Sequence, residues 1–78
     1  MANFICKVFD QLTGKLVVSV QKQFTTQQDA RESLPQIVTE IKGLEDGEYY
    51  ADLYNEQGNS VPAPRYSLIS KNGVVTIN

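Results

Sequence analysis

The chain has 78 residues, of which 41% are hydrophobic and 21% are charged, and its formal net charge is −2. This length allows one modest hydrophobic core, and the composition excludes a disordered or fibrous protein. Histidine is absent and Cys6 is the single cysteine, which excludes an intramolecular disulfide, a cysteine–histidine nucleophile pair and the usual zinc sites. We therefore expect one small globular domain over residues 1–78.

The chain opens with two predicted strands. Residues 4–9 alternate in side-chain character, and one face of this strand carries Phe4, Cys6 and Val8. Residues 10–15 contain turn-forming types, including Gly14. Residues 16–24 are rich in valine and continue the alternation, which predicts a second strand joined to the first as a hairpin.

A helix is predicted next, over about residues 26–42. Apolar residues recur with the spacing of one buried helical face, at Ala30, Leu34, Ile37, Val38, Ile41 and Leu44. Thr25 or Thr26 suits the N-cap, and Gly43 suits the C-terminal cap. Pro35 falls inside this range and removes one backbone hydrogen bond, so we expect a bent helix, with two short helices meeting at Pro35 as the alternative.

Three further strands are predicted after the helix. Residues 48–54 alternate so that Tyr49, Ala51 and Leu53 face the helix, whereas the opposite face carries Tyr50, Asp52 and Tyr54. Residues 55–60 have the composition of a loop. Residues 61–64 are expected to be extended, because each of the two prolines biases the residue before it toward extended geometry. Residues 65–70 and 74–77 flank an Asn-Gly pair, which is typical of a tight hairpin turn.

These elements predict an α+β fold in the order ββαβββ, with a single helix packed on a four- to five-stranded, mainly antiparallel sheet. Two arrangements of the strands remain open. One is β-grasp-like, in which the two outer hairpins meet through a central parallel pair. The other is a fully antiparallel meander, with the helix lying across it.

No group of residues indicates catalysis or a cofactor. The three carboxylates at a predicted turn, Glu45, Asp46 and Glu48, lack the denser spacing of a calcium loop. The five glycines are isolated, so none of them forms a phosphate-binding loop. Cys6 has no histidine to activate it and is expected to be a buried hydrophobic residue. We expect no enzyme, no cofactor and no bound metal.

The acidic residues are unevenly distributed. Residues 1–39 carry four basic and three acidic side chains, whereas residues 40–78 carry three basic and six acidic ones. Tyrosine is enriched at binding hot spots, and acidic surfaces attract basic partners. The predicted partner-binding residues are Glu45, Asp46, Glu48, Tyr50, Asp52, Tyr54 and Glu56. The alternative is that the tyrosines only cover an exposed sheet face by pairing with Arg65 or Lys7.

These features favour a small acidic, non-enzymatic module that binds the basic, nucleic-acid-binding surface of a partner protein. Compact acidic proteins of phages and mobile elements commonly inhibit in this way, and the analogy rests on size and charge. One alternative is a structural or assembly protein, such as a homodimer, that self-associates through strand edges. A second is a single-stranded nucleic-acid binder, which the acidic residues around the tyrosines disfavour.

Two observations bear on the compartment. Lys7 interrupts the N-terminal apolar stretch, so no signal peptide is expected, and no run approaches the roughly 18 apolar residues of a membrane span. The single cysteine fits a reducing environment. We therefore expect a cytoplasmic protein that does not contact membranes.

Overall fold

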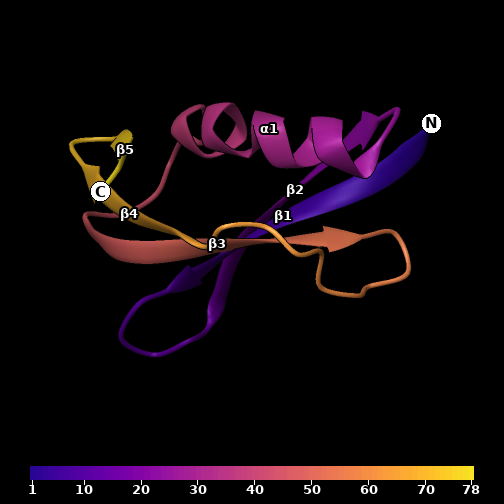
Figure 1. Cartoon of the computed structure of the whole chain (residues 1–78). Coiled ribbons are helices and arrows are strands. Elements are labelled where there is room, and N and C mark those ends of the chain that lie inside the picture. Colours follow the sequence, from indigo (N-terminus) through magenta and orange to yellow (C-terminus); the bar gives the residue numbers. More distant parts are fainter.

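A single helix covers one face of a five-stranded sheet in a computed structural model that describes residues 1–78 (Figure 1). In chain order the elements are β1 (Ala2–Asp10), β2 (Leu16–Phe24), α1 (Gln27–Thr39), β3 (Gly47–Asn55), β4 (Tyr66–Lys71) and β5 (Val74–Ile77). The predicted α+β class and the order ββαβββ are therefore confirmed.

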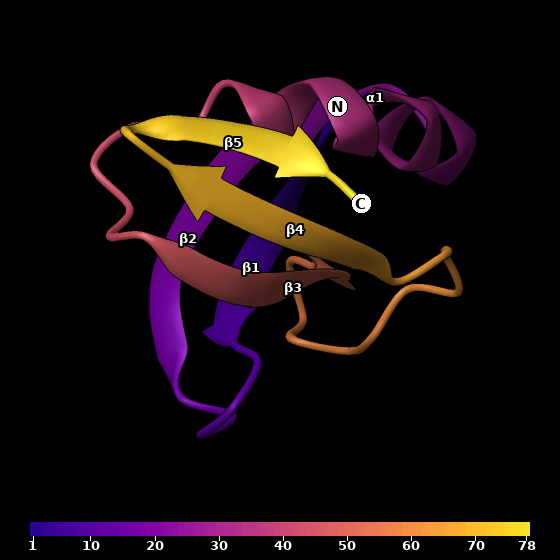
Figure 2. The same ribbon diagram turned by 90° about the vertical axis from the view of Figure 1, so that its left-hand side faces the viewer.

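The strands lie in the order β2-β1-β3-β4-β5, and every neighbouring pair is antiparallel. The sheet is thus fully antiparallel, and the β-grasp-like arrangement, with its central parallel pair, is wrong. The antiparallel arrangement is correct in strand direction but not as a meander, because β1 and not β2 lies beside β3. The reason lies in the connection after β2, because α1 carries the chain across β1 and β3 then pairs with the free edge of β1. The sheet is twisted, so that β1 and β2 cross the direction of β4 and β5 (Figure 2).

The helix begins as predicted but ends early. Thr26 is the N-cap, and its Oγ1 accepts a hydrogen bond from the backbone N–H of Asp29 at 3.1 Å. One helix continues through Pro35, so the two-helix alternative is wrong. The helix ends at Thr39 with Glu40 as its C-cap, three residues before the predicted end, and Gly43 is not the cap.

The core lies between α1 and the sheet, and most of its members were predicted, by alternation along residues 4–9 and 48–54 and by the helical spacing of residues 30–41. Fourteen residues form it: Phe4, Cys6, Val8, Ala30, Leu34, Ile37, Val38, Ile41, Tyr49, Ala51, Leu53, Val61, Leu68 and Val75. Leu68, Val75 and Val61 were not predicted as core residues, and of these Val61 lies outside every predicted strand. Its N–H donates to the Leu53 carbonyl at 2.8 Å, and this bond holds the side chain, which is 4% exposed, against the end of β3.

The opposite face of the sheet carries no helix (Figure 1). Side chains that alternate with the core residues of β1 and β3 therefore point away from α1. Half-buried residues of this face include Ile5, Lys7, Phe9, Tyr50, Asp52 and Tyr54. α1 is the one helix of the chain, and it is neither long nor apolar enough to cross a bilayer.

Candidate binding face

The uncovered side of the sheet brings aromatic and charged side chains of three segments together. We call this surface the open face and define it by Ile5, Lys7 and Phe9 of β1, Tyr50, Asp52 and Tyr54 of β3, and Arg65 directly before β4. The register of β1 and β3 places Phe9 opposite Tyr50, Lys7 opposite Asp52 and Ile5 opposite Tyr54. The open face therefore lies at the middle of the sheet.

An aromatic pair occupies one end of the open face. The Phe9 and Tyr50 rings are stacked, with centroids 5.1 Å apart and planes inclined by 21°. The pair follows from the register, because these residues are direct cross-strand neighbours. Stacked rings that water still reaches form a flat, rigid surface with an apolar body.

Arg65 connects Tyr50 to Asp52. Its Nε and Nη2 donate to the two carboxylate oxygens of Asp52 at 2.9 and 3.0 Å, and its guanidinium carbon lies 4.6 Å from the centre of the Tyr50 ring. The hydrogen bond and the charge of Asp52 raise the pKa of Arg65 above its ordinary value. The Arg65 side chain is 64% exposed and that of Asp52 is 18% exposed, so the pair is open to solvent mainly on the arginine side.

Lys7 covers the second tyrosine. Its Nζ lies 4.4 Å from the centre of the Tyr54 ring, a cation–π arrangement, although Asp52 is its direct neighbour across the strands. Each tyrosine of the open face therefore has one cation over its ring. These are the pairings with Lys7 and Arg65 that the sequence suggested as the alternative to a binding role.

The seven predicted binding residues lie in three places. Glu48, Tyr50, Asp52 and Tyr54 share the outward side of β3, and the exposed Glu56 follows directly after the strand. Glu45 and Asp46 lie in the turn before β3, where the Asp46 carboxylate accepts the N–H of Asn72 at 2.9 Å and so ties this turn to the β4–β5 hairpin. The structure therefore does not bring the seven residues together into one patch.

On the open face itself, basic and acidic side chains are more evenly balanced than the acidic residues around it suggest. Lys7 and Arg65 lie at its centre, and Asp52 is already paired. Glu48 and Glu56 lie near the two ends of β3, on either side of the tyrosines. A rise of about 3.3 Å per strand residue places these two residues roughly 26 Å apart. The open face is thus an aromatic centre with compensated charge and an acidic residue at each end.

Phe9 and Ile5 are the members of the open face that the sequence analysis did not single out. Alternation along β1 places them opposite the core residues, but only the pairing of β1 with β3 brings them beside the tyrosines. That pairing joins Phe9 and Ile5 to residues 41 and 49 positions away in the chain, which no local pattern encodes.

Side chains that could hold a metal ion are not clustered, since no group of three or more cysteine or carboxylate residues is present. We found no match to this chain among protein-family models, curated proteins or solved structures.

Proposed function

We propose that this protein is a non-enzymatic module that binds a partner protein through its open face, with Glu48 and Glu56 directed at basic groups of that partner. The observation that carries the proposal is the stacked Phe9–Tyr50 pair on a sheet face that no helix covers. Tyrosine and arginine are enriched at interface hot spots, and both stand at the centre of this face.

The pairings within the open face support binding because they hold its side chains in place. Asp52 fixes the Arg65 guanidinium by two hydrogen bonds, and Arg65 in turn lies over Tyr50. Side chains held before association lose less conformational entropy when a partner binds. Asp52 therefore acts in the proposal as a positioning residue, and the acidic contacts are assigned to Glu48 and Glu56.

The test compares capture of host proteins by immobilised wild-type chain and by variants, followed by affinity measurement on the captured partner. Tyr50→Ala is expected to weaken that partner's affinity at least thirtyfold, the effect of about 2 kcal/mol at a hot spot. Glu48→Lys/Glu56→Lys is expected to slow association and to reduce the salt dependence of binding. Unchanged affinity of the Tyr50 variant would remove the open face from the interface.

The control for the charge changes is Glu32→Lys, a substitution of an exposed residue on α1, on the other side of the sheet. It is expected to bind as the wild type does. Circular dichroism of each variant establishes that the fold is retained, so that lost binding reports on the surface.

A single-stranded nucleic acid is the second candidate ligand, favoured by the combination of the aromatic stack with Lys7 and Arg65 on one sheet face. Against it, Asp52, Glu48 and Glu56 lie on the same side and repel phosphates. Fluorescence anisotropy with a labelled oligothymidine separates the two proposals. Salt-sensitive binding that Tyr50→Ala abolishes would favour the nucleic acid over a protein partner.

A further inference from the structure

The outer strand β2 offers a second interaction surface, at the edge of the sheet. It is nine residues long, contains no proline or glycine, and pairs with β1 on one side only. Gln11 N–H donates to the Glu48 carbonyl at 3.1 Å, so by alternation the odd residues of β1 bond to β3 and the even ones to β2. The backbone groups of β2 left without strand partners then belong to Ser19, Gln21 and Gln23.

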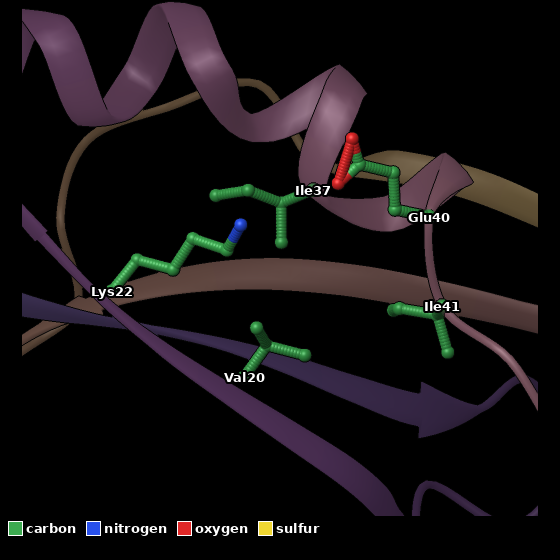
Figure 3. A pocket seen from close by; sticks show the side chains of 5 residues that line it. All are labelled: Val20, Lys22, Ile37, Glu40 and Ile41. Carbon is green, nitrogen blue, oxygen red and sulfur yellow. The ribbon is translucent and has the colours of Figure 1, made fainter.

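A groove lies beside this edge, between β2 and α1 (Figure 3). Its volume is about 170 Å³, and its aliphatic lining comes from Val20, Ile37 and Ile41. Lys22 reaches it from β2 and Glu40 from the end of α1. These two side chains form no ion pair with each other, since the one ion pair of the chain joins Arg65 to Asp52.

Lys22 limits what can pair with this edge. Its register partner is the core residue Phe4, so the lysine stands on the helix side of an edge strand, where a charge discourages addition of another strand. An added strand is compatible with Lys22 only if it brings an acidic group to that side of the sheet. A second copy of this chain does so, because Glu40 lies on the same side.

We propose that two copies of the chain pair antiparallel through β2, about a two-fold axis at Val20, to form one continuous ten-stranded sheet. In this register Ser19 lies opposite Gln21 of the partner subunit, so the unpaired backbone groups of both strands meet as hydrogen-bonded pairs. Val20 meets Val20 of the partner subunit at the closer, non-hydrogen-bonded position beside the groove. Lys22 lies opposite Val18 of the partner subunit, on the side from which Glu40 of the partner subunit approaches.

This interface does not depend on the open face. It uses the edge of β2 and the helix side of the sheet, whereas Tyr50, Tyr54 and Arg65 lie on the opposite side. A monomeric chain would leave the proposed function untouched, and loss of partner binding at the open face would leave the dimer untouched.

The first test is the oligomeric state of the full chain, measured by sedimentation equilibrium over about 1 to 500 µM. We expect a monomer–dimer equilibrium with a dissociation constant below about 100 µM. A chain that remains monomeric over the whole range would overturn the proposal.

The second test uses the charges. Lys22→Glu places two acidic groups together across the two-fold axis, and Glu40→Lys places two basic groups together, so each variant alone is expected to dimerise at least tenfold more weakly. Mixing the two variants makes both contacts complementary, and native mass spectrometry should then show the mixed dimer in excess over either homodimer. Absence of that excess would reject the register, even for a wild type that dimerises.

Two controls accompany the charge variants. Lys71→Glu makes the same charge change as Lys22→Glu but lies at the far end of β4, and Glu32→Lys makes the opposite change nearer the start of α1. Both are expected to dimerise as the wild type does. Weakening by either control equal to that of the test variants would show a general charge effect and overturn the assigned contact.

The third test removes one outward backbone donor. The N–H of Gln21 points away from β1, so Gln21→Pro leaves the β1–β2 hydrogen bonds in place, and proline is tolerated at such edge positions. The variant should retain the circular dichroism spectrum of the wild type and sediment as a monomer. A folded Gln21→Pro chain that dimerises as strongly as the wild type would contradict pairing through β2.

Discussion

Cys6 shows how far the surroundings of one residue determine its chemistry. It lies on β1 between Val20 of β2 and Leu53 of β3, and it is fully buried, as the sequence predicted. Burial, with a smaller effect from the charge of Asp52, raises the pKa of the Cys6 thiol to about 12. At neutral pH the thiol is therefore protonated and unreactive, and its role is packing.

The raised pKa of Cys6 predicts a loss of stability at alkaline pH. In the unfolded chain the thiol ionises above its ordinary pKa of 9.0, whereas in the folded chain it stays protonated up to about 12. The stabilisation is therefore complete below pH 9 and is lost as pH rises from 9 to 12, with a slope of up to about 1.4 kcal/mol per pH unit. Urea unfolding of wild type and Cys6→Ala at intervals between pH 8 and 11 measures the difference in slope.

Cys6→Ala also creates a cavity, which lowers the stability of the variant by an amount that does not depend on pH, so only the slope is compared. Tyr49 has a pKa that burial and the nearby carboxylates of Asp10, Glu45 and Asp46 raise, and it adds the same alkaline slope to both proteins. Identical slopes for the two proteins would show that Cys6 does not ionise differently on unfolding.

At the level of single residues, the sequence predicted the side of the sheet to which a side chain points better than it predicted the atoms that the side chain contacts. Alternation placed Tyr50, Asp52 and Tyr54 on the side away from the helix, and the structure confirms that placement. It also suggested Arg65 or Lys7 as pairing partners, which the structure shows at specific atoms. The bidentate contact to Asp52 could not be predicted, because it depends on where the loop before β4 returns to the sheet.

Among the elements, α1 departs most from its predicted bounds. The apolar stripe continues to Ile41, which is buried as predicted, but the helix ends two residues earlier, at Thr39. The Thr39 hydroxyl donates to the carbonyls of Pro35 and Gln36, and the N–H of Glu40 bonds to carbonyls of the last turn. A buried residue therefore need not belong to the helix that its spacing continues.

Because of Pro35, we expect α1 to be less stable than it would be with alanine at this position. Without an N–H, Pro35 leaves the carbonyl of Arg31 without its helical donor, and proline in a helix interior costs about 3 kcal/mol relative to alanine. Pro35→Ala should increase the free energy of unfolding by about 2–2.5 kcal/mol, which is the cost of proline less the freedom worth about 0.5–1 kcal/mol that the unfolded chain gains. Urea unfolding measures the change, with the exposed Gln36→Ala as the neighbouring control. A destabilised Pro35→Ala chain would show that the ring packs more favourably than it disrupts.

At the scale of the whole molecule, the sequence predicted the content of the sheet but not the order of its strands. The hairpins β1–β2 and β4–β5 are local, and turn residues such as Asn72 and Gly73, both at positive φ, specify the second of them. The joining of the two halves through β1 and β3 is not local, and the β-grasp-like and antiparallel orders share the same element pattern. The open face exists only because that joining brings Phe9 beside Tyr50.

Because the molecule is small, we expect its free energy of unfolding to depend strongly on each central core residue. Leu34 is fully buried at the middle of α1, and replacing such a leucine by alanine costs about 2.5–5 kcal/mol. A chain of 78 residues has a total stability of only about 4–12 kcal/mol, so Leu34→Ala should lose a large part of it and unfold at a clearly lower temperature. Thermal unfolding followed by circular dichroism measures the loss. Leu12→Ala, at a turn position that is 94% exposed, is the matched control and should change stability by no more than about 0.5 kcal/mol. If the two variants unfolded at similar temperatures, the contacts of α1 with the sheet would not be what holds this fold together.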